Sequence, residues 1–183
     1  NEIKELLTHE PTAELLAELA QDKRVAVQKL LQSYHKRIEK AALEKERFYK
    51  MLSYERQYYG EGAKLIAGVD EAGRGPLAGP LVIAAVILPE DVFISGLNDS
   101  KQISASKRAK LYDEVLQKAI SVRVNIVSIS NIDELNIYRA TQVGMSEVLL
   151  SLDVRPDVAL IDAMPVEAED IKSISIDINV GND

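Results

Sequence analysis

The sequence predicts an α/β fold in which a mixed sheet with flanking helices follows an all-helical N-terminal extension. Three observations lead to this prediction. Residues 22–59 contain neither proline nor glycine and consist mostly of good helix formers. From residue 65 onward, short apolar runs rich in β-branched residues take over. These runs alternate with helical stretches, which is typical of a sheet that is partly parallel through crossover helices.

The N-terminal extension is expected to span residues 1–62. Pro11 is a break in the pattern, and Thr12 beside it is a suitable start for a short helix. In the longer stretch that follows, apolar residues recur close to the helical period at positions 27, 30, 31, 34, 38 and 41. One long helix or a helical hairpin would satisfy this pattern equally well. The sequence YGEG at residues 59–62 then predicts a linker.

Residues 63–183 are expected to form the sheet-containing domain. Short apolar runs predict buried strands at residues 65–69, 81–88 and 158–161, and an alternating pattern predicts a strand at residues 122–129. A helical stretch covers residues 106–119. A second helix face runs from Ile137 to Leu152, and Asn136 before it is a good cap.

The composition is that of a soluble globular protein, with 46% hydrophobic and 28% charged residues among 183. The longest apolar run, residues 81–88, is much too short to cross a bilayer, and no secretion signal is recognisable. The absence of cysteine excludes disulfides and thiolate metal sites and favours a reducing compartment. We therefore predict a cytoplasmic protein without a membrane partner.

The net charge of −7 argues against nucleic acid as a partner if it is taken alone, but the charge is unevenly distributed. Residues 1–22 carry −5, residues 23–60 carry +6 and residues 61–183 carry −8. The basic segment has two interpretations. It is either a solvated helical face packed against the core, or a clamp that adds sequence-independent affinity for a nucleic-acid duplex.

Carboxylates follow two of the predicted strands. Asp70 and Glu71 come directly after residues 65–69, and Asp162 follows residues 158–161. If these strands are neighbours, the three side chains meet at one edge of the sheet, where a cation would have to neutralise them. Oxygen ligands without cysteine favour Mg²⁺ or Mn²⁺ over zinc. The alternative is that each Asp is only a turn residue or a helix cap.

A glycine turn, Gly73-Arg74-Gly75, adjoins these carboxylates. Such a turn is most often only a connection, but exposed backbone N–H groups beside an arginine can also bind an anion or the edge of a sugar. The segment lacks the lysine and the Ser/Thr ending of a nucleotide-hydrolase phosphate loop.

The segments GVDEAGRGPLAGP (68–80), GLNDSKQIS (96–104), NIYRATQVGM (136–145) and LIDAM (160–164) together resemble the ribonuclease HII family, also called type 2 ribonuclease H. GVDEAGRGPLAGP (68–80) is similar to the family signature, and its arginine favours this family over ribonuclease HIII, which carries lysine there. GLNDSKQIS (96–104) is similar to the L-x-DSKKL-S segment, with Gln102 replacing a lysine. NIYRATQVGM (136–145) resembles the NI-x-x-AT-x-x-AM helix, with Gly144 replacing alanine, and LIDAM (160–164) resembles a strand that carries a catalytic aspartate. Residues 1–60 look like the helical extension of some bacterial members.

The resemblance implies an RNase H-like fold and an endoribonuclease that cleaves the RNA strand of RNA–DNA hybrids and cuts 5′ to ribonucleotides embedded in duplex DNA. Asp70, Glu71 and Asp162 match three of the four catalytic carboxylates and would hold two Mg²⁺ or Mn²⁺ ions. Gly73, Arg74 and Gly75 would bind the ribose 2′-OH, which distinguishes RNA from DNA. Asn98, Ser100 and Lys101 would contact the substrate, Lys101 at backbone phosphates. A cytoplasmic monomer acting in ribonucleotide excision repair is the corresponding expectation.

The C-terminal tail departs from the family pattern. The fourth carboxylate normally lies in a KGDA-x-S segment beyond the LIDAM strand, whereas this tail reads PVEAEDIKSISIDINVGND. Asp177 and Asp183 are the candidates there. Either part of the full protein, including its C-terminal part, is missing from this sequence, or the protein is a defective homologue. The alternative function is accordingly a catalytically impaired nucleic-acid-binding homologue or fragment.

Overall fold

The structure is a computed structural model that describes residues 2–75, 79–162 and 164–176. The chain divides into two compact units, Asn1–Lys50 and Met51–Asp183. The second unit begins earlier than the domain boundary expected at residues 62 and 63, because it includes the helix just before the sheet. None of the helices in the described ranges combines the length and the apolar character needed to cross a membrane.

The first unit is helical, as the sequence predicts. It contains α1 (Glu2–Leu6), α2 (Ala13–Gln21) and most of α3 (Val25–Met51). Thr12 begins α2 as expected, because its side chain accepts a hydrogen bond from the Leu15 N–H at 3.3 Å. A small core joins the three helices through Leu7, Leu19, Val27 and Leu31. Arg37 on α3 also donates a hydrogen bond to the Leu7 carbonyl.

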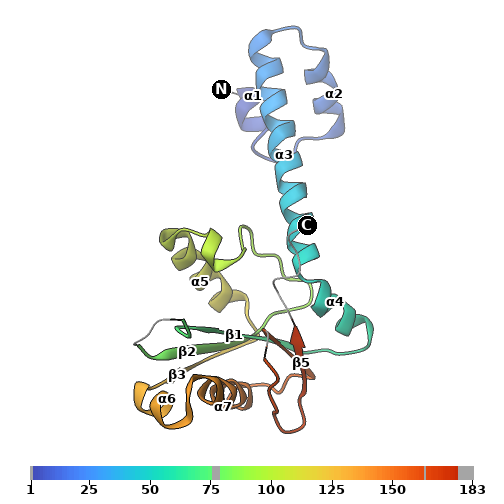
Figure 1. Cartoon of the computed structure of the whole chain (residues 1–183). Helices are drawn as coiled ribbons and strands as arrows, with labels where there is room; N and C mark the ends of the chain where they lie inside the picture. Colours follow the sequence, from blue (N-terminus) through green and yellow to red (C-terminus); the bar gives the residue numbers. More distant parts are fainter. Residues whose placement is uncertain (1, 76–78, 163, 177–183) are drawn as a thin grey trace. The chain divides into compact units, whose positions relative to one another are not determined.

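The second unit is built on a mixed five-stranded sheet in the order β3-β2-β1-β4-β5 (Figure 1). Its strands are β1 (Ile66–Ala72), β2 (Leu81–Ile87), β3 (Ser121–Val127), β4 (Val158–Asp162) and β5 (Lys172–Ile176). The pairs β1–β2 and β2–β3 are antiparallel, whereas β1–β4 and β4–β5 are parallel. The predicted fold class, a mixed sheet with flanking helices after a helical extension, is therefore confirmed.

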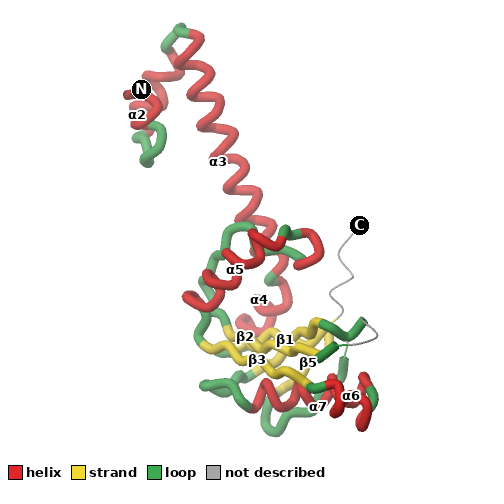
Figure 2. Tube along the Cα trace, turned by 90° about the vertical axis from the view of Figure 1, so that its left-hand side faces the viewer, coloured by secondary structure: helices red, strands yellow, loops and turns green. Residues whose placement is uncertain are grey.

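Helices cover both faces of the sheet (Figure 2). One face carries α6 (Ile129–Leu135) and α7 (Ile137–Leu150), and the other carries α5 (Ala105–Lys118) and α4 (Ser53–Gly60). The main core lies under α7. It is formed by buried sheet residues (Ala67, Val69, Leu81, Ile83, Ala85, Ile87) and buried α7 residues (Ala140, Met145, Val148, Leu149). On the α4 side, Tyr58 and Tyr59 pack against a smaller buried group that includes Ile66 and Leu160.

Several boundaries differ from the predicted ones. The segment 22–60 forms two helices, α3 and α4, that are separated at Leu52. The strand predicted to reach residue 129 ends at Val127, because the Ser128 hydroxyl accepts the Asn131 N–H and starts α6. Strand β5 has no counterpart among the predicted strands. The cap at Asn136 is confirmed, since its side chain accepts the Arg139 N–H at 3.1 Å.

Candidate active site

Asp70 and Asp162 lie at the same level of two neighbouring parallel strands. The parallel ladder between β1 and β4 pairs Ile66 with Val158 and continues to Val69 with Ile161. Asp70 and Asp162 are the next residues of the two strands. The sequence predicts that β1 ends before Asp70, but the strand continues, and Asp70 pairs with Ala84 of β2. The sequence predicts that Asp70, Glu71 and Asp162 meet at this edge of the sheet, and the structure places Asp70 and Asp162 at the same level of adjacent strands.

The surroundings of Asp70 raise its pKa. Desolvation by the surrounding protein is the main cause that raises its pKa above the ordinary value of 3.8, and the negative charge of Asp162 adds to it. The Glu71 N–H, which donates to Asp70 Oδ1 at 2.7 Å, and the positive charge of Lys101 both lower the pKa in part. A cation bound between the two aspartates would relieve their mutual repulsion.

One oxygen of Asp162 is buried without a partner. Within the described part of the chain, Oδ1 of Asp162 makes no hydrogen bond although it is shielded from solvent. A buried carboxylate oxygen without a donor is costly, and natural structures usually satisfy such an atom with a donor, a water molecule or an ion. This orphaned oxygen, placed beside Asp70, fits a hard divalent cation, which prefers oxygen ligands.

Glu71 points away from Asp70, because successive side chains of a strand alternate between the two faces. It pairs across the sheet with Ile83, a member of the core under α7, and its carboxylate receives Arg74 Nη1 at 3.4 Å. Across the described residues, no three Asp, Glu, His or Cys side chains form a group that could hold a metal ion. The structure therefore groups Asp70 with Asp162 and leaves Glu71 beside Arg74.

The turn after β1 depends on a glycine at its first position. Gly73 has φ +93°, and a Cβ built there would lie 2.6 Å from the Pro80 carbonyl oxygen. Any side chain would therefore be strained at this position. Gly75 differs, since a Cβ there would meet no described atom within 4 Å. Packing accounts for Gly73, and the open space at Gly75 leaves room for a ligand to approach the backbone.

The segment with Asn98, Ser100 and Lys101 is held by local hydrogen bonds. It leads into the short 3₁₀ helix η1 (Ser100–Gln102), where Asp99 Oδ1 accepts the Lys101 N–H at 2.9 Å. Asn98 uses its side-chain amide to donate to Gln102 at 3.1 Å. Lys101 lies near enough to influence the pKa of Asp70 electrostatically. Lys101 is thus the member of this group that the structure connects with the carboxylate pair.

Sequence reasoning missed a residue that organises this site. Arg108 on α5 donates from Nη1 to the carbonyls of Ser100 (3.1 Å) and Ile103 (2.6 Å), which fixes the segment around Lys101. Its position one helical turn into α5, after the Ser104 cap, was the only signal in the sequence. Asp177 and Asp183, named as candidates for a fourth carboxylate, lie outside the described residues.

Comparisons with known proteins agree with these observations. The family model "Ribonuclease HII N-terminal domain" matches residues 1–59, and the model "Ribonuclease HII" matches residues 67–179. A ribonuclease HII of Lactobacillus delbrueckii subsp. bulgaricus is 49% identical over 170 residues, covering 92% of this chain and 66% of that protein. One from Bacillus anthracis is 49% identical over 167 residues, covering 86% of this chain and 65% of that protein.

A solved structure is similar as well. The ribonuclease H2 of Pyrococcus horikoshii superimposes with a TM-score of 0.54 at 28% identity and covers 62% of each chain. The present chain spans about two thirds of the length of the curated relatives it matches. Because one family model covers most of the sheet-containing unit and the other covers the helical region, the chain belongs to the ribonuclease HII family.

Proposed function

We propose that this protein is a metal-dependent endoribonuclease that hydrolyses RNA in RNA–DNA hybrids and cuts 5′ to single ribonucleotides in duplex DNA. The observation that carries the proposal is the pair Asp70 and Asp162 on adjacent parallel strands, together with the buried, orphaned Oδ1 of Asp162. Membership of the ribonuclease HII family supports the same activity.

Asp70 and Asp162 would hold the two divalent ions, Mg²⁺ or Mn²⁺. Glu71 faces Arg74 on the other side of the strand, so it would have to leave that contact to join them. The chemistry that such ions supply is activation of the attacking water and stabilisation of the leaving 3′ oxygen. In the overall reaction water adds to phosphorus and the P–O3′ bond breaks. The task of Asp70 and Asp162 is to hold negative charge at a fixed place, which explains why the fold accepts their repulsion.

Substrate selection would depend on the turn Gly73-Arg74-Gly75 and on Lys101. The open space at Gly75 lets a ribose approach the backbone, and a 2′-OH can exchange hydrogen bonds with backbone groups. Arg74 is held by Glu71 at 3.4 Å through one nitrogen and keeps other N–H donors for the substrate. Lys101 would bind a backbone phosphate next to the carboxylates, which positions the duplex without reading its sequence.

A second candidate function is nucleic-acid binding without cleavage. Two observations favour it: the tail carries no KGD segment, and no group of three potential ligands is found among the described residues. Such a protein would bind hybrids through the same turn but would lack a complete metal site.

The decisive experiment uses a DNA duplex with one ribonucleotide, in Mg²⁺ and in Mn²⁺, with the 183-residue chain and with the full-length product of its gene. Cleavage 5′ to the ribonucleotide is expected, and Asp70→Asn should reduce it by at least about a thousandfold, because the substitution removes a negative charge at the reacting centre. Asp113→Asn, the same change at an exposed position of α5, is the control. A full-length protein that binds the duplex but never cuts it would establish the second candidate instead.

A further inference from the structure

Helix α7 is fixed firmly on the sheet. A Cβ built at Gly144 would lie 2.5 Å from Ile83 Cδ1 and 2.9 Å from Val127 Cγ2, so the helix backbone approaches the sheet very closely there. Asn125 of β3 donates to the Gly144 carbonyl at 3.4 Å and to Glu147 Oε2 at 2.9 Å. This helix can therefore serve as a rigid support for a segment that lacks regular structure of its own.

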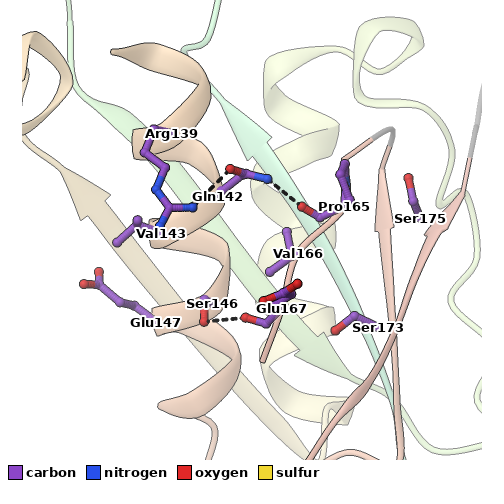
Figure 3. Close-up of a pocket in the computed structure, with 10 residues that line it drawn as sticks. All are labelled: Arg139, Gln142, Val143, Ser146, Glu147, Pro165, Val166, Glu167, Ser173 and Ser175. Atoms are coloured by element: carbon purple, nitrogen blue, oxygen red, sulfur yellow. Dashed lines mark hydrogen bonds between the residues drawn. The ribbon is translucent and has the colours of Figure 1, made fainter. Parts of the chain in front are cut away.

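Such a segment follows Asp162. Residues 164–167 belong to no helix or strand, and the side chains of Met164 and Val166 are buried. Two carbonyls of the segment find donors on α7: Gln142 Nε2 donates to Pro165 at 2.9 Å, and Ser146 Oγ donates to Glu167 at 3.0 Å (Figure 3). Two consecutive turns of one helix face thus hold the segment at two points.

The orientation of Gln142 is itself controlled. Arg139 Nη1 donates to Gln142 Oε1 at 3.4 Å, so the amide NH₂ of Gln142 is directed to Pro165 (Figure 3). These residues border a cavity of about 590 Å³ that separates α7 from Ser173 and Ser175 of β5. Among the described residues, the two hydrogen bonds from Gln142 and Ser146 are the side-chain connections from α7 to the carbonyls of this segment.

Asp162 is the last residue of β4. It still pairs with Ile176 of β5, whereas the ladder with β1 ends one residue earlier, at Ile161. No hydrogen bond in the described part of the chain holds its buried Oδ1, so the path of the backbone on either side is one of the constraints on the carboxylate. Pro165, the first carbonyl that α7 holds, comes only three residues after Asp162.

We propose that Gln142 and Ser146 are positioning residues that fix the chain leaving β4 and thereby aim Asp162 at Asp70. The inference deepens the proposed function and rests on it for the role of Asp162. It assigns no contact with substrate to either residue. Replacing a residue that orients a metal ligand without touching the metal typically lowers metal affinity or activity by about 10–100-fold.

The test combines backbone dynamics, metal binding and kinetics in the double variant Gln142→Leu/Ser146→Ala of the whole 183-residue chain. In the metal-free protein, the ¹⁵N order parameter of the Asp162 amide should fall from the rigid range of about 0.85 towards 0.6. Mn²⁺ affinity, measured by calorimetry, should drop about tenfold, and kcat on the ribonucleotide-containing duplex should drop by a similar factor with KM unchanged. Ser146→Thr, which keeps the hydroxyl donor, should behave as wild type.

Gln117→Leu, the same side-chain change at an exposed position of α5, is the matched control and should alter none of these quantities. A double variant whose melting temperature falls while the Asp162 order parameter and the Mn²⁺ affinity stay at wild-type values would overturn the inference, since the two residues would then be merely structural. If the wild type binds no Mn²⁺, the order parameter of the Asp162 amide alone decides whether Gln142 and Ser146 position Asp162. A wild type that cuts no duplex refutes the proposed function but leaves the order parameter as the test of positioning.

Discussion

Leu65 and Asp157 form a reciprocal pair at the start of the parallel ladder between β1 and β4. The Asp157 N–H donates to the Leu65 carbonyl at 2.8 Å, and Asp157 Oδ2 accepts the N–H groups of Leu65 at 3.0 Å and Lys64 at 2.8 Å. Asp70 and Asp162 each lie five residues further along their strands. The same in-register alignment therefore begins at this pair and ends at the two carboxylates.

The Asp157 contact should give stability a recognisable pH dependence. The two backbone N–H donors hold the pKa of Asp157 below its ordinary value of 3.8. A lowered folded-state pKa means that the contribution is complete above the unfolded pKa and is lost as pH falls through the folded pKa. The difference in free energy of unfolding between wild type and Asp157→Ala should thus be constant above about pH 5 and shrink below pH 3.8. Denaturant titrations at a series of pH values measure it.

Asp157→Asn provides the control for that experiment. Neither asparagine nor alanine titrates, so the difference between these two variants should not depend on pH. A wild-type-to-alanine difference that is flat down to about pH 2 would contradict the assignment of the charge to these two N–H groups.

The two glycines of the turn should respond differently to alanine. Gly73→Ala meets both a positive φ and the Pro80 carbonyl, and we expect the free energy of unfolding to fall by about 1–3 kcal/mol. Gly75→Ala meets no described atom, and its stability should stay within about 0.5 kcal/mol of wild type. If a ribose approaches the Gly75 backbone, KM for the ribonucleotide-containing duplex should nevertheless rise. Wild-type KM in a folded Gly75→Ala variant would refute that contact.

The close approach of α7 to the sheet should be measurable in a double-mutant cycle. Gly144→Ala gains about 1 kcal/mol of helix propensity but overpacks the contact with Ile83 Cδ1 by about 1–3 kcal/mol, so a net loss of about 1 kcal/mol is expected. Ile83→Val removes that methyl group. The double variant should therefore be more stable than the sum of the two single changes predicts, and strict additivity would contradict the steric explanation.

The basic segment 23–60 offers a test of the clamp interpretation. Lys29, Lys36 and Lys40 are exposed on α3, and replacing all three with glutamine removes their charge while keeping polar side chains. If these lysines bind phosphates, the slope of log affinity against log salt should become shallower by about one for each phosphate that is no longer neutralised. Glu39→Gln/Glu46→Gln on the same helix should not weaken binding. An unchanged salt slope in the lysine variant would favour a solvated face.

The sheet and its carboxylate pair were predictable because both depend on local pattern. Apolar runs identified β1, β2 and β4, and an aspartate after each of two strands indicated the pair Asp70 and Asp162. The parallel pairing of β1 and β4 places these two residues at the same level of the sheet. Helix caps could be predicted equally well, since the side chains of Thr12 and Asn136 accept hydrogen bonds from backbone N–H groups only three residues further along the chain.

Other features depend on contacts that sequence does not reveal. Strand β5 has the sequence KSISI, in which serine separates the isoleucines, so it lacks the continuous apolar run that identified β4. Its Ile174 and Ile176 pack with the group around Tyr58 and Tyr59, a contact that the sequence does not show. Glu71 adjoins Asp70 in sequence, yet strand alternation turns it to the opposite face. Gln142 and Ser146 donate to backbone carbonyls, which every residue has, so the sequence gives no sign of the acceptors and only the structure shows these hydrogen bonds.

The order of strands in the sheet also limits the order in which strand pairs can form while the chain is being synthesised. β1, β2 and β3 follow one another in the chain and pair as neighbours, whereas β4 must be inserted beside β1 after α6 and α7 have been made. Pairing between segments so distant in sequence is intrinsically slow, because the chain between them must first be closed into a loop. A nascent chain that has reached α7 on the ribosome therefore holds Asp70 without its partner. The pair Asp70 and Asp162 therefore cannot form before β4 has been made and has paired with β1.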